Sequence, residues 1–334
     1  HSGDNRYRII SVPRDAPGRE EPMGSKRKFW FRDENQQRCL FKFNRIDHGE
    51  DWAEKIAAEL ASALGYAHAH VELAEYEGFP WIVSRDFTST ARSGIVRSLT
   101  HGNELMVEFV GSHYPAHGNH FRVRQHTVDN VLEVLSRDEF GPPDVMRDSI
   151  GIVSAADAIP AIHRAALAPT YDHASSLGRE ISETDRLARL DGKDANRTVQ
   201  RYLDRAKGRW FRSEDASHPI SPMKAFHRAA HLRPTAAAAS LDRLRSLTSD
   251  HMRRVVERVP EARISLAARR FTQEVLDLNR NDLLTSAPYP MVSNVSPNSP
   301  WRNLETGASS PPDACTTRTV KEDARCQWDD ESGK

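Results

Sequence analysis

The chain has 334 residues, which is more than an average domain needs and predicts two domains or one large two-lobed unit with extensions. Lysine and arginine together number 47, as do aspartate and glutamate, so no overall basic field favours nucleic acid or an anionic membrane as partner. Charged residues make up 28% of the chain and the mean hydropathy is -0.65, which favours a soluble protein with a polar surface.

The cysteines and the amino-terminal residues indicate the compartment. Cys39 lies alone in a strand-like run, whereas Cys315 and Cys326 lie in a polar region with no histidine nearby, so neither disulfides nor a zinc site are predicted. The 15 histidines lack the paired spacing of a closed metal site. The first residues do not resemble a signal peptide, and no run approaches about 18 apolar residues. We therefore expect a cytoplasmic protein without a membrane span.

Short β-like runs dominate the chain from Tyr7 to Phe87. They are interrupted by one helix-like segment, residues 49–65, in which Trp52, Ile56 and Leu60 follow one stripe. The expected strands lie within residues 6–12, 26–31, 38–43, 71–76 and 80–87. This pattern predicts a small β-rich lobe with a single helix.

From about residue 98 to residue 285, apolar spacings of three and four predict a mainly helical region. In the stretch HGNEL, His101 and Glu104 stand together at a helix start, where capping explains them and no catalytic role is assigned. The clearest helical segments are residues 127–137, 238–247 and 264–284.

The composition changes again after Pro288. Proline, serine and charged residues without periodicity predict a disordered tail. The chain is thus expected to divide into residues 1–95, 96–287 and 288–334. A small β-rich lobe followed by a larger helical lobe predicts an α+β fold of two lobes, and ligands commonly bind in the cleft between such lobes.

The first lobe offers two features that suit an anionic ligand. Gly24 and Ser25 form a turn before a strand, where backbone amides can lie over phosphates, although a single glycine also suits an ordinary turn. Lys42 stands between Phe41 and Phe43 in an apolar strand. Its ammonium either meets an anion in the cleft or extends to water from a strand edge.

The helix after Lys42 carries acids that give Lys42 a candidate partner. Asp51 and Glu54 lie in its opening turns, and Glu59 flanks the apolar stripe. A strand lysine paired with a glutamate of the next helix orients the α- and β-phosphates of ATP in kinase-fold proteins. The alternative is a surface helix whose amino-terminal acids are favoured by the helix dipole.

Asp172 in the stretch TYDH follows a short apolar run and precedes a polar loop that ends in glycine. An aspartate at such a corner either holds a metal ion or forms a turn or helix cap. The local residues do not decide between these two interpretations.

Taken in order, six segments resemble the HipA-like serine/threonine kinase family of bacteria, whose founding member is the toxin of a toxin-antitoxin pair. The resemblance continues through RWF, HPISPMKAFHRAA and VPEARISLAARRFTQEVLDLNRNDLL, and it covers about residues 7–285. It implies a bilobal protein-kinase-like fold, ATP and Mg²⁺ as cofactors, and a protein substrate or an antitoxin-like partner. The six segments are GSKRKFW, CLFKFN, GEDWAEKIAAELASALGY, VELAEYEGFPWIVSRDF, HGNEL and LAPTYDHASSLGRE.

The resemblance implies roles for particular residues. Gly24, Ser25 and Lys28 match the glycine loop over the triphosphate, and Lys42 matches the phosphate-orienting lysine. Asp172 matches the aspartate that holds Mg²⁺ against the β- and γ-phosphates.

The remaining matches concern the helix glutamate and the adenine. By alignment Glu54 takes the position of the family's helix glutamate, but a helical wheel turns it away from the apolar stripe and leaves Glu59 as the alternative. The hinge that contacts adenine through backbone groups includes Val83, Ser84 and Arg85.

The chain departs from the family before Asp172. The family carries a catalytic loop there, with an aspartate that accepts the substrate proton and an asparagine that holds a second Mg²⁺. Between Ser154 and Asp172 the only acid is Asp157, no asparagine follows it, and Pro160 would interrupt a helix. An internal deletion accounts for this interval, and the catalytic residues remain unknown.

Three functions therefore compete. The first is an active ATP-dependent serine/threonine kinase, and the second is a degenerate kinase-fold nucleotide binder or regulatory partner. The third is a remnant that binds no nucleotide, or a structural interaction protein. Transfer to a peptide separates the first from the others, and nucleotide binding without transfer separates the second from the third.

Overall fold

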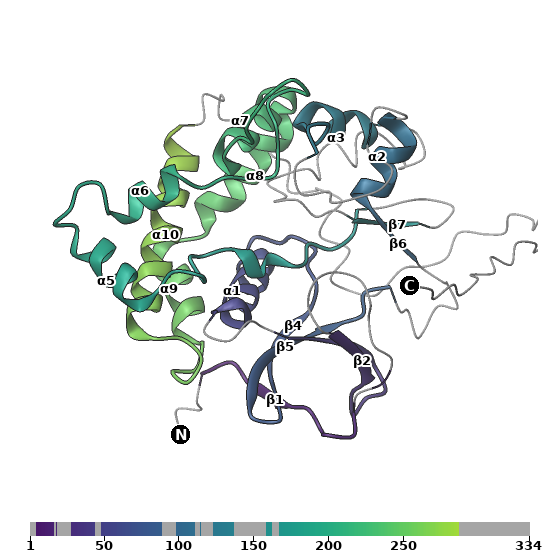
Figure 1. Ribbon diagram of the computed structural model, residues 1–334, viewed down its shortest axis with the longest axis vertical. Coiled ribbons are helices and arrows are strands. Elements are labelled where there is room, and N and C mark those ends of the chain that lie inside the picture. The colour runs from purple at the N-terminus through teal and green to yellow at the C-terminus, as the bar shows by residue number, and fades with distance from the viewer. Residues whose placement is uncertain are drawn as a thin grey trace, which may run out of the picture. The chain divides into compact units, whose positions relative to one another are not determined.

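The computed structural model in Figure 1 describes residues 5–16, 18, 28–43, 48–88, 98–110, 114, 123–136, 158–161 and 167–286. Its amino-terminal part is a five-stranded mixed sheet with one helix, and the part that follows is mainly helical. The α+β class predicted from the sequence is therefore confirmed. The predicted tail and the division into three parts stay predictions, because residues 287–334 lie outside the described residues.

The sheet has the strand order β1-β4-β5-β3-β2, so β5 is its central strand. The β1–β4 pair is parallel and the other three pairs are antiparallel. Each of the five strands overlaps one of the five β-like runs expected from the sequence, and β2 and β5 each extend one residue beyond their run. Their bounds are Ile9–Ser11 for β1, Lys28–Arg32 for β2, Arg38–Lys42 for β3, Val71–Tyr76 for β4 and Phe79–Arg85 for β5.

Alternation along β2 and β3 gives the sheet two different faces, because successive side chains of a strand point to opposite sides. On one face Phe29 stacks on Phe41, with ring centroids 4.8 Å apart, and both rings are buried. On the other face Trp30, Leu40 and Lys42 line a cavity. The apolar face fixes the register and thereby holds the cavity face in place.

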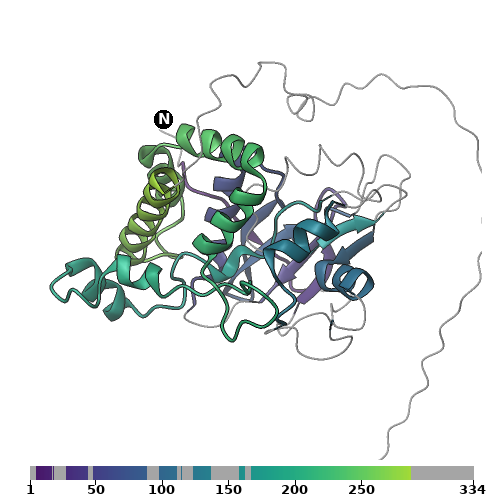
Figure 2. The same cartoon turned by 90° about the horizontal axis from the view of Figure 1, so that it is seen from above.

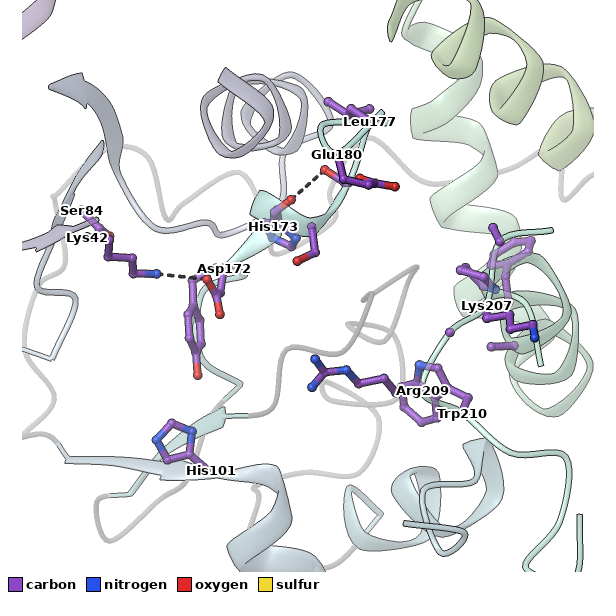
Figure 3. Close-up of a pocket in the computed structure, with 18 of the residues that line it drawn as sticks. Lys42, Ser84, His101, Asp172, His173, Leu177, Glu180, Lys207, Arg209 and Trp210 are labelled. Atoms are coloured by element: carbon purple, nitrogen blue, oxygen red, sulfur yellow. Dashed lines mark hydrogen bonds and ion pairs between the residues drawn. The ribbon is translucent and has the colours of Figure 1, made fainter. Parts of the chain in front are cut away.

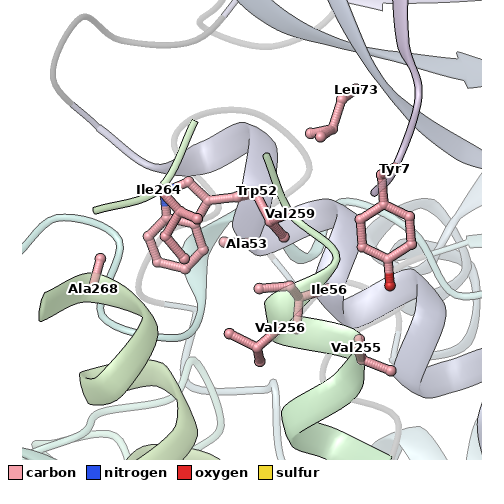
Figure 4. Packing of buried hydrophobic residues seen from close by; sticks show 10 residues of the cluster. All are labelled: Tyr7, Trp52, Ala53, Ile56, Leu73, Val255, Val256, Val259, Ile264 and Ala268. Carbon is pink, nitrogen blue, oxygen red and sulfur yellow. The ribbon is translucent and has the colours of Figure 1, made fainter. Parts of the chain in front are cut away.

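Helix α1, Glu50–Ala63, packs its apolar stripe against the helical part (Figure 4). Trp52 and Ile56 lie in one buried cluster with Val256 and Val259, at the end of helix α9 (Ser249–Glu257). The opposite face of α1 is covered too, because the short 3-10 helix η4, His173–Ser175, lies against it. The first two turns of α1 are therefore buried all round, unlike those of a surface helix.

Most of the described helices after residue 98 begin at a polar N-cap residue. Six N-cap side chains, all serine or threonine, accept a hydrogen bond from the backbone three residues on. In Figure 2 the green helices after residue 222 lie together beside the purple and blue strands. The bounds are Gly102–Val110 for α2, Val128–Val134 for α3, Glu183–Asp191 for α5, Val199–Asp204 for α6, Pro222–Leu232 for α7, Pro234–Ser246 for α8 and Leu266–Thr285 for α10.

A pair of strands was not expected from the sequence. Strand β6, Ser98–His101, pairs with strand β7, Ala158–Ala161, in an antiparallel two-stranded sheet. Helix α2 then starts as predicted, with the backbone N–H of His101 donating to the Glu104 carboxylate at 2.9 Å. Among the described helices, none is long and apolar enough to cross a bilayer.

Candidate functional site

A cavity of about 1230 Å³ lies against the polar face of the sheet. Trp30, Leu40 and Lys42 line it from the strands. The segment from Tyr171 to Leu177 and the residues around Trp210 line it from the helical part (Figure 3). The cavity thus joins elements that are far apart in the sequence, as a ligand site between lobes requires.

Lys42 and Asp172 meet in this cavity although 130 positions separate them in the chain. The Lys42 Nζ lies 3.3 Å from the Asp172 Oδ1, and the two side chains are 13% and 66% exposed. Asp172 precedes η4 with φ 61°, a left-handed conformation that aspartate tolerates. Its side chain makes no capping hydrogen bond, so a helix cap does not account for this carboxylate.

A second lysine stands beside Lys42. Lys28 of β2 is its direct cross-strand partner, and both side chains line the cavity. The two lysines thus bring positive charge to the same wall of the cavity.

Glu54 lies near Lys42 and Asp172 and is almost fully buried, with 1% of its surface exposed. Burial raises the pKa of its carboxyl group, and the nearby charge of Asp172 acts in the same direction. The charge of Lys42 and hydrogen bonds from the backbone N–H groups of His173 and Ala174 oppose this rise in pKa. Its Oε2 has no hydrogen-bond partner among the described residues. The carboxylate is therefore held by the start of η4, and the charge of Lys42 acts on it.

Glu59, the alternative helix acid, has other partners. Its carboxylate lies 2.8 Å from the Lys55 Nζ and 3.5 Å from Arg258. Glu54 is therefore the helix acid whose charge acts on the Lys42 site. The helical wheel favoured Glu59 over Glu54 because it considers only the apolar stripe and not η4, which contacts the same helix.

The buried Glu54 predicts a dependence of stability on pH. Because its folded pKa lies above the ordinary value of 4.5, the protonated form stabilises the fold fully below that value, and this stabilisation is lost as pH rises through the folded pKa. Glu54→Gln carries no charge to bury. We expect it to raise the free energy of unfolding by about 0.5–2 kcal/mol at pH 8, and by less at pH 5.

Melting curves of wild type and Glu54→Gln at both pH values measure this effect. Glu59→Gln is the matched control, because it removes a paired and half-buried carboxylate from the same helix. It should lower the melting temperature at both pH values. Destabilisation by Glu54→Gln at pH 8 equal to that by Glu59→Gln would contradict the argument.

The loop after η4 is tied to the start of α1. Arg179 Nη1 lies 2.7 Å from Glu50 Oε1, and the backbone N–H of Gly49 donates to the Arg179 carbonyl oxygen at 3.3 Å. Gly178 has φ 69°, and a Cβ at this position would lie 2.5 Å from the Phe271 ring. These contacts fix the loop that carries Asp172. Only the glycine at the end of the loop signalled a tight turn in the sequence.

The residues predicted to form the hinge lie within β5, which is paired on both sides with β3 and β4. Ser84 and Arg85 line the cavity, but the Val83 side chain packs into the core on the other face. The backbone of Val83 and Ser84 belongs to the ladder with β3 and β4, and the expected contact of these groups with adenine stays a prediction. The chain leaves the ladder after Arg85, and Phe87 beyond it also lines the cavity.

Two predictions fall outside the described residues. Gly24 and Ser25 of the glycine loop lie there, as does Asp157 in the interval before Asp172. The phosphate loop and the missing catalytic loop therefore stay predictions. Within the described part of the chain, no three histidine, cysteine, aspartate or glutamate side chains come together as a metal site.

Comparison with known proteins identifies the fold. No protein-family model and no curated protein matches the sequence. The crystal structure of the Helicobacter pylori proinflammatory kinase CtkA is similar, with a TM-score of 0.63 and 13% identity over 84% of this chain and 96% of CtkA. HipA of Shewanella oneidensis MR-1, solved with HipB and operator DNA, gives a TM-score of 0.50 and 11% identity over 82% of this chain and 65% of HipA. The chain thus has the protein-kinase-like fold of HipA and CtkA, as the motifs predicted.

Proposed function

We propose that the chain binds Mg-ATP in the cavity against the sheet, and that phosphoryl transfer to protein serine or threonine is impaired or lost because the catalytic loop is missing. The observation that carries this proposal is the contact of Lys42 with Asp172 at 3.3 Å, beside the buried Glu54. Strand β3, helix α1 and the start of η4 each contribute one of these side chains. A strand lysine, a helix acid and a carboxylate after a turn are the parts that kinases use to hold Mg-ATP.

The cavity suits the organic parts of a nucleotide. Lys28 and Lys42 give positive charge for phosphates, and Trp30 and Leu40 offer aromatic and aliphatic surface on the same face of the sheet. Small-molecule sites combine apolar walls with a few placed polar groups in this way.

The residues present also fit Mg²⁺ as part of a nucleotide complex. Magnesium prefers oxygen ligands, keeps several waters, and is bound through one or two carboxylates plus substrate phosphates. Asp172 offers one carboxylate that is 66% exposed. When bound, Mg-ATP supplies a γ-phosphoryl group, and the roles of Lys42 and Asp172 are to bind and orient it.

Two other functions remain as alternatives, each with a different result. An active kinase of the toxin-antitoxin type would transfer phosphate to a protein, and a remnant or structural interaction protein would bind no nucleotide. The HipA structure contains HipB, which makes an antitoxin-like protein a proposed partner of this chain. The cytoplasmic location expected from the sequence stays part of the proposal.

Addition of Mg-ATP is expected to raise the melting temperature of the wild-type chain. A ligand that binds only the folded state adds about 2.7 kcal/mol at a hundredfold excess over its Kd. We expect Lys42→Ala and Asp172→Ala to lose most of this ligand-induced shift, because each removes a group that holds the phosphates or the metal. Thermal unfolding at rising Mg-ATP concentration measures it.

The chain offers a matched control. Lys193 and Asp191 form an exposed ion pair of 2.8 Å and do not line the cavity. Lys193→Ala and Asp191→Ala should keep the full shift. A cooperative melt of the wild type without any shift would favour the remnant, and an equal loss in the control variants would overturn the assignment of the site.

A further inference from the structure

We infer that a second wall of the cavity recognises acidic residues of the protein that presents its serine or threonine to the site. This wall, called the basic strip here, consists of Arg205, Lys207 and Arg209. The inference rests on the proposed function and names its substrate class, a protein with aspartate or glutamate around the accepting hydroxyl group.

The basic strip faces the nucleotide side of the cavity. All three side chains are exposed, and all three line the same cavity as Lys42 and Asp172. Figure 3 shows Lys207 and Arg209 on the opposite side of the cavity from these two residues. A peptide bound along the strip would therefore lie next to the donor site.

The backbone that carries the strip is held in place. The N–H of Gly208 donates to the Ile220 carbonyl oxygen at 2.9 Å, and the N–H of Ile220 donates to the Trp210 carbonyl oxygen at 2.7 Å. Phe211, which follows Trp210, is buried, and its backbone N–H donates to the His126 carbonyl oxygen at 2.8 Å. A preformed binding surface costs little conformational entropy when a partner binds.

Within the described residues, two cations of the strip, Arg205 and Lys207, differ from the arginines around them in their ion pairs. Nearby arginines have carboxylate partners, since Arg189 pairs with Asp185 and Arg201 pairs with Asp204. For Arg205 and Lys207 no such partner is found in the described part of the chain. The local excess is notable in a protein whose formal net charge is zero. It gives an acidic partner both attraction and orientation.

The length of the strip favours a short peptide. The three cations occupy alternate positions of one short segment that follows α6 and precedes Phe211. Acidic residues close together in a peptide can contact them at the same time. Single-stranded nucleic acid is the other polyanion to consider, but a strip of three cations inside a cavity is short for its backbone, and the chain has no basic field.

Fluorescence anisotropy of a labelled nine-residue peptide tests the inference without nucleotide. The peptide has a central serine with glutamates at alternate positions, and a second peptide has glutamines there. The strip variant is Arg205→Gln with Lys207→Gln. Its control is Arg201→Gln with Arg212→Gln, two exposed arginines that flank the strip and do not line the cavity.

We expect the glutamate peptide to bind wild type about tenfold more tightly than the glutamine peptide, with an affinity that falls as salt rises. The strip variant should lose about fivefold to tenfold, and the control variant less than twofold. Mg-ATP should still raise the melting temperature of the strip variant. Lys42→Ala should lose the rise in melting temperature with Mg-ATP and should still bind the glutamate peptide. This difference separates failure of the proposed function from failure of this inference.

Three results would overturn the inference. The first is equal binding of both peptides to wild type, or an equal loss in the strip and control variants. The second is loss of the Mg-ATP shift in the strip variant, which would assign the strip to the phosphates of the nucleotide. The third is a single-stranded oligonucleotide of nine residues that binds the strip more tightly than the glutamate peptide.

Discussion

Arg263→Ala is expected to lower the free energy of unfolding by about 3–5 kcal/mol, because it leaves a buried carboxylate without its cation. Arg263 Nη1 lies 2.8 Å from Asp51 Oδ2, and each side chain is only 5% exposed. The same guanidinium group donates to the carbonyl oxygen of Ala74 in β4. One side chain thus joins the start of α1, the sheet and the segment before α10.

The state of Asp51 explains the size of this effect. Burial raises the pKa of its carboxyl group, and the Arg263 charge acts against that rise. Without the guanidinium group, Asp51 either stays charged in an apolar place or takes up a proton, and both cost free energy. Since Asp51 and Glu54 share the first turns of α1, we also expect weaker Mg-ATP binding.

Urea unfolding followed by circular dichroism measures the loss. Arg253→Ala is the control, because Arg253 is 51% exposed, pairs with Asp250 on the surface, and should cost about 0–1 kcal/mol. Adding Asp51→Asn to Arg263→Ala should recover part of the loss by removing the buried charge. Equal losses for Arg253→Ala and Arg263→Ala would show that the buried pair contributes no more than a surface pair.

Much of the fold could be predicted because its signals are local. The five strands coincide with short runs rich in apolar residues, and α1 and α10 carry apolar residues three and four positions apart. The pairing of β6 with β7 was missed, since it depends on a contact between residues about 60 positions apart. The burial of Asp51 and Glu54 was missed for the same kind of reason. Charged residues at a helix start usually indicate a solvent-exposed end, and the sequence does not show that another segment covers them.

The candidate site depended on more than local pattern. Nothing in the spacing of Lys42 and Asp172 predicts that they meet, and their common place in one cavity was expected only through the family resemblance. The choice between Glu54 and Glu59 needed the position of η4. The residues predicted to form the hinge lie inside β5, and a sequence does not show where a central strand ends, so their contact with adenine stays a prediction.

With Mg-ATP and a protein acceptor, the wild-type chain is expected to transfer phosphoryl groups far more slowly than active kinases, which turn over at about 1–100 s⁻¹. A positioned general base contributes about 10²–10⁴-fold, and the interval between Ser154 and Asp172 offers no aspartate followed by asparagine. Lys42 and Asp172 would still bind and orient the nucleotide. The turnover should therefore fall below about 1 s⁻¹ while Mg-ATP binding persists.

Release of ADP and mass spectrometry of the acceptor measure this turnover, with Asp172→Ala as the background. Lys193→Ala keeps the cavity intact and should behave like the wild type. If wild type and Asp172→Ala give the same low rate while only wild type binds Mg-ATP, the site holds a nucleotide without using it. A wild-type rate within the kinase range that Asp172→Ala abolishes would instead establish an active kinase.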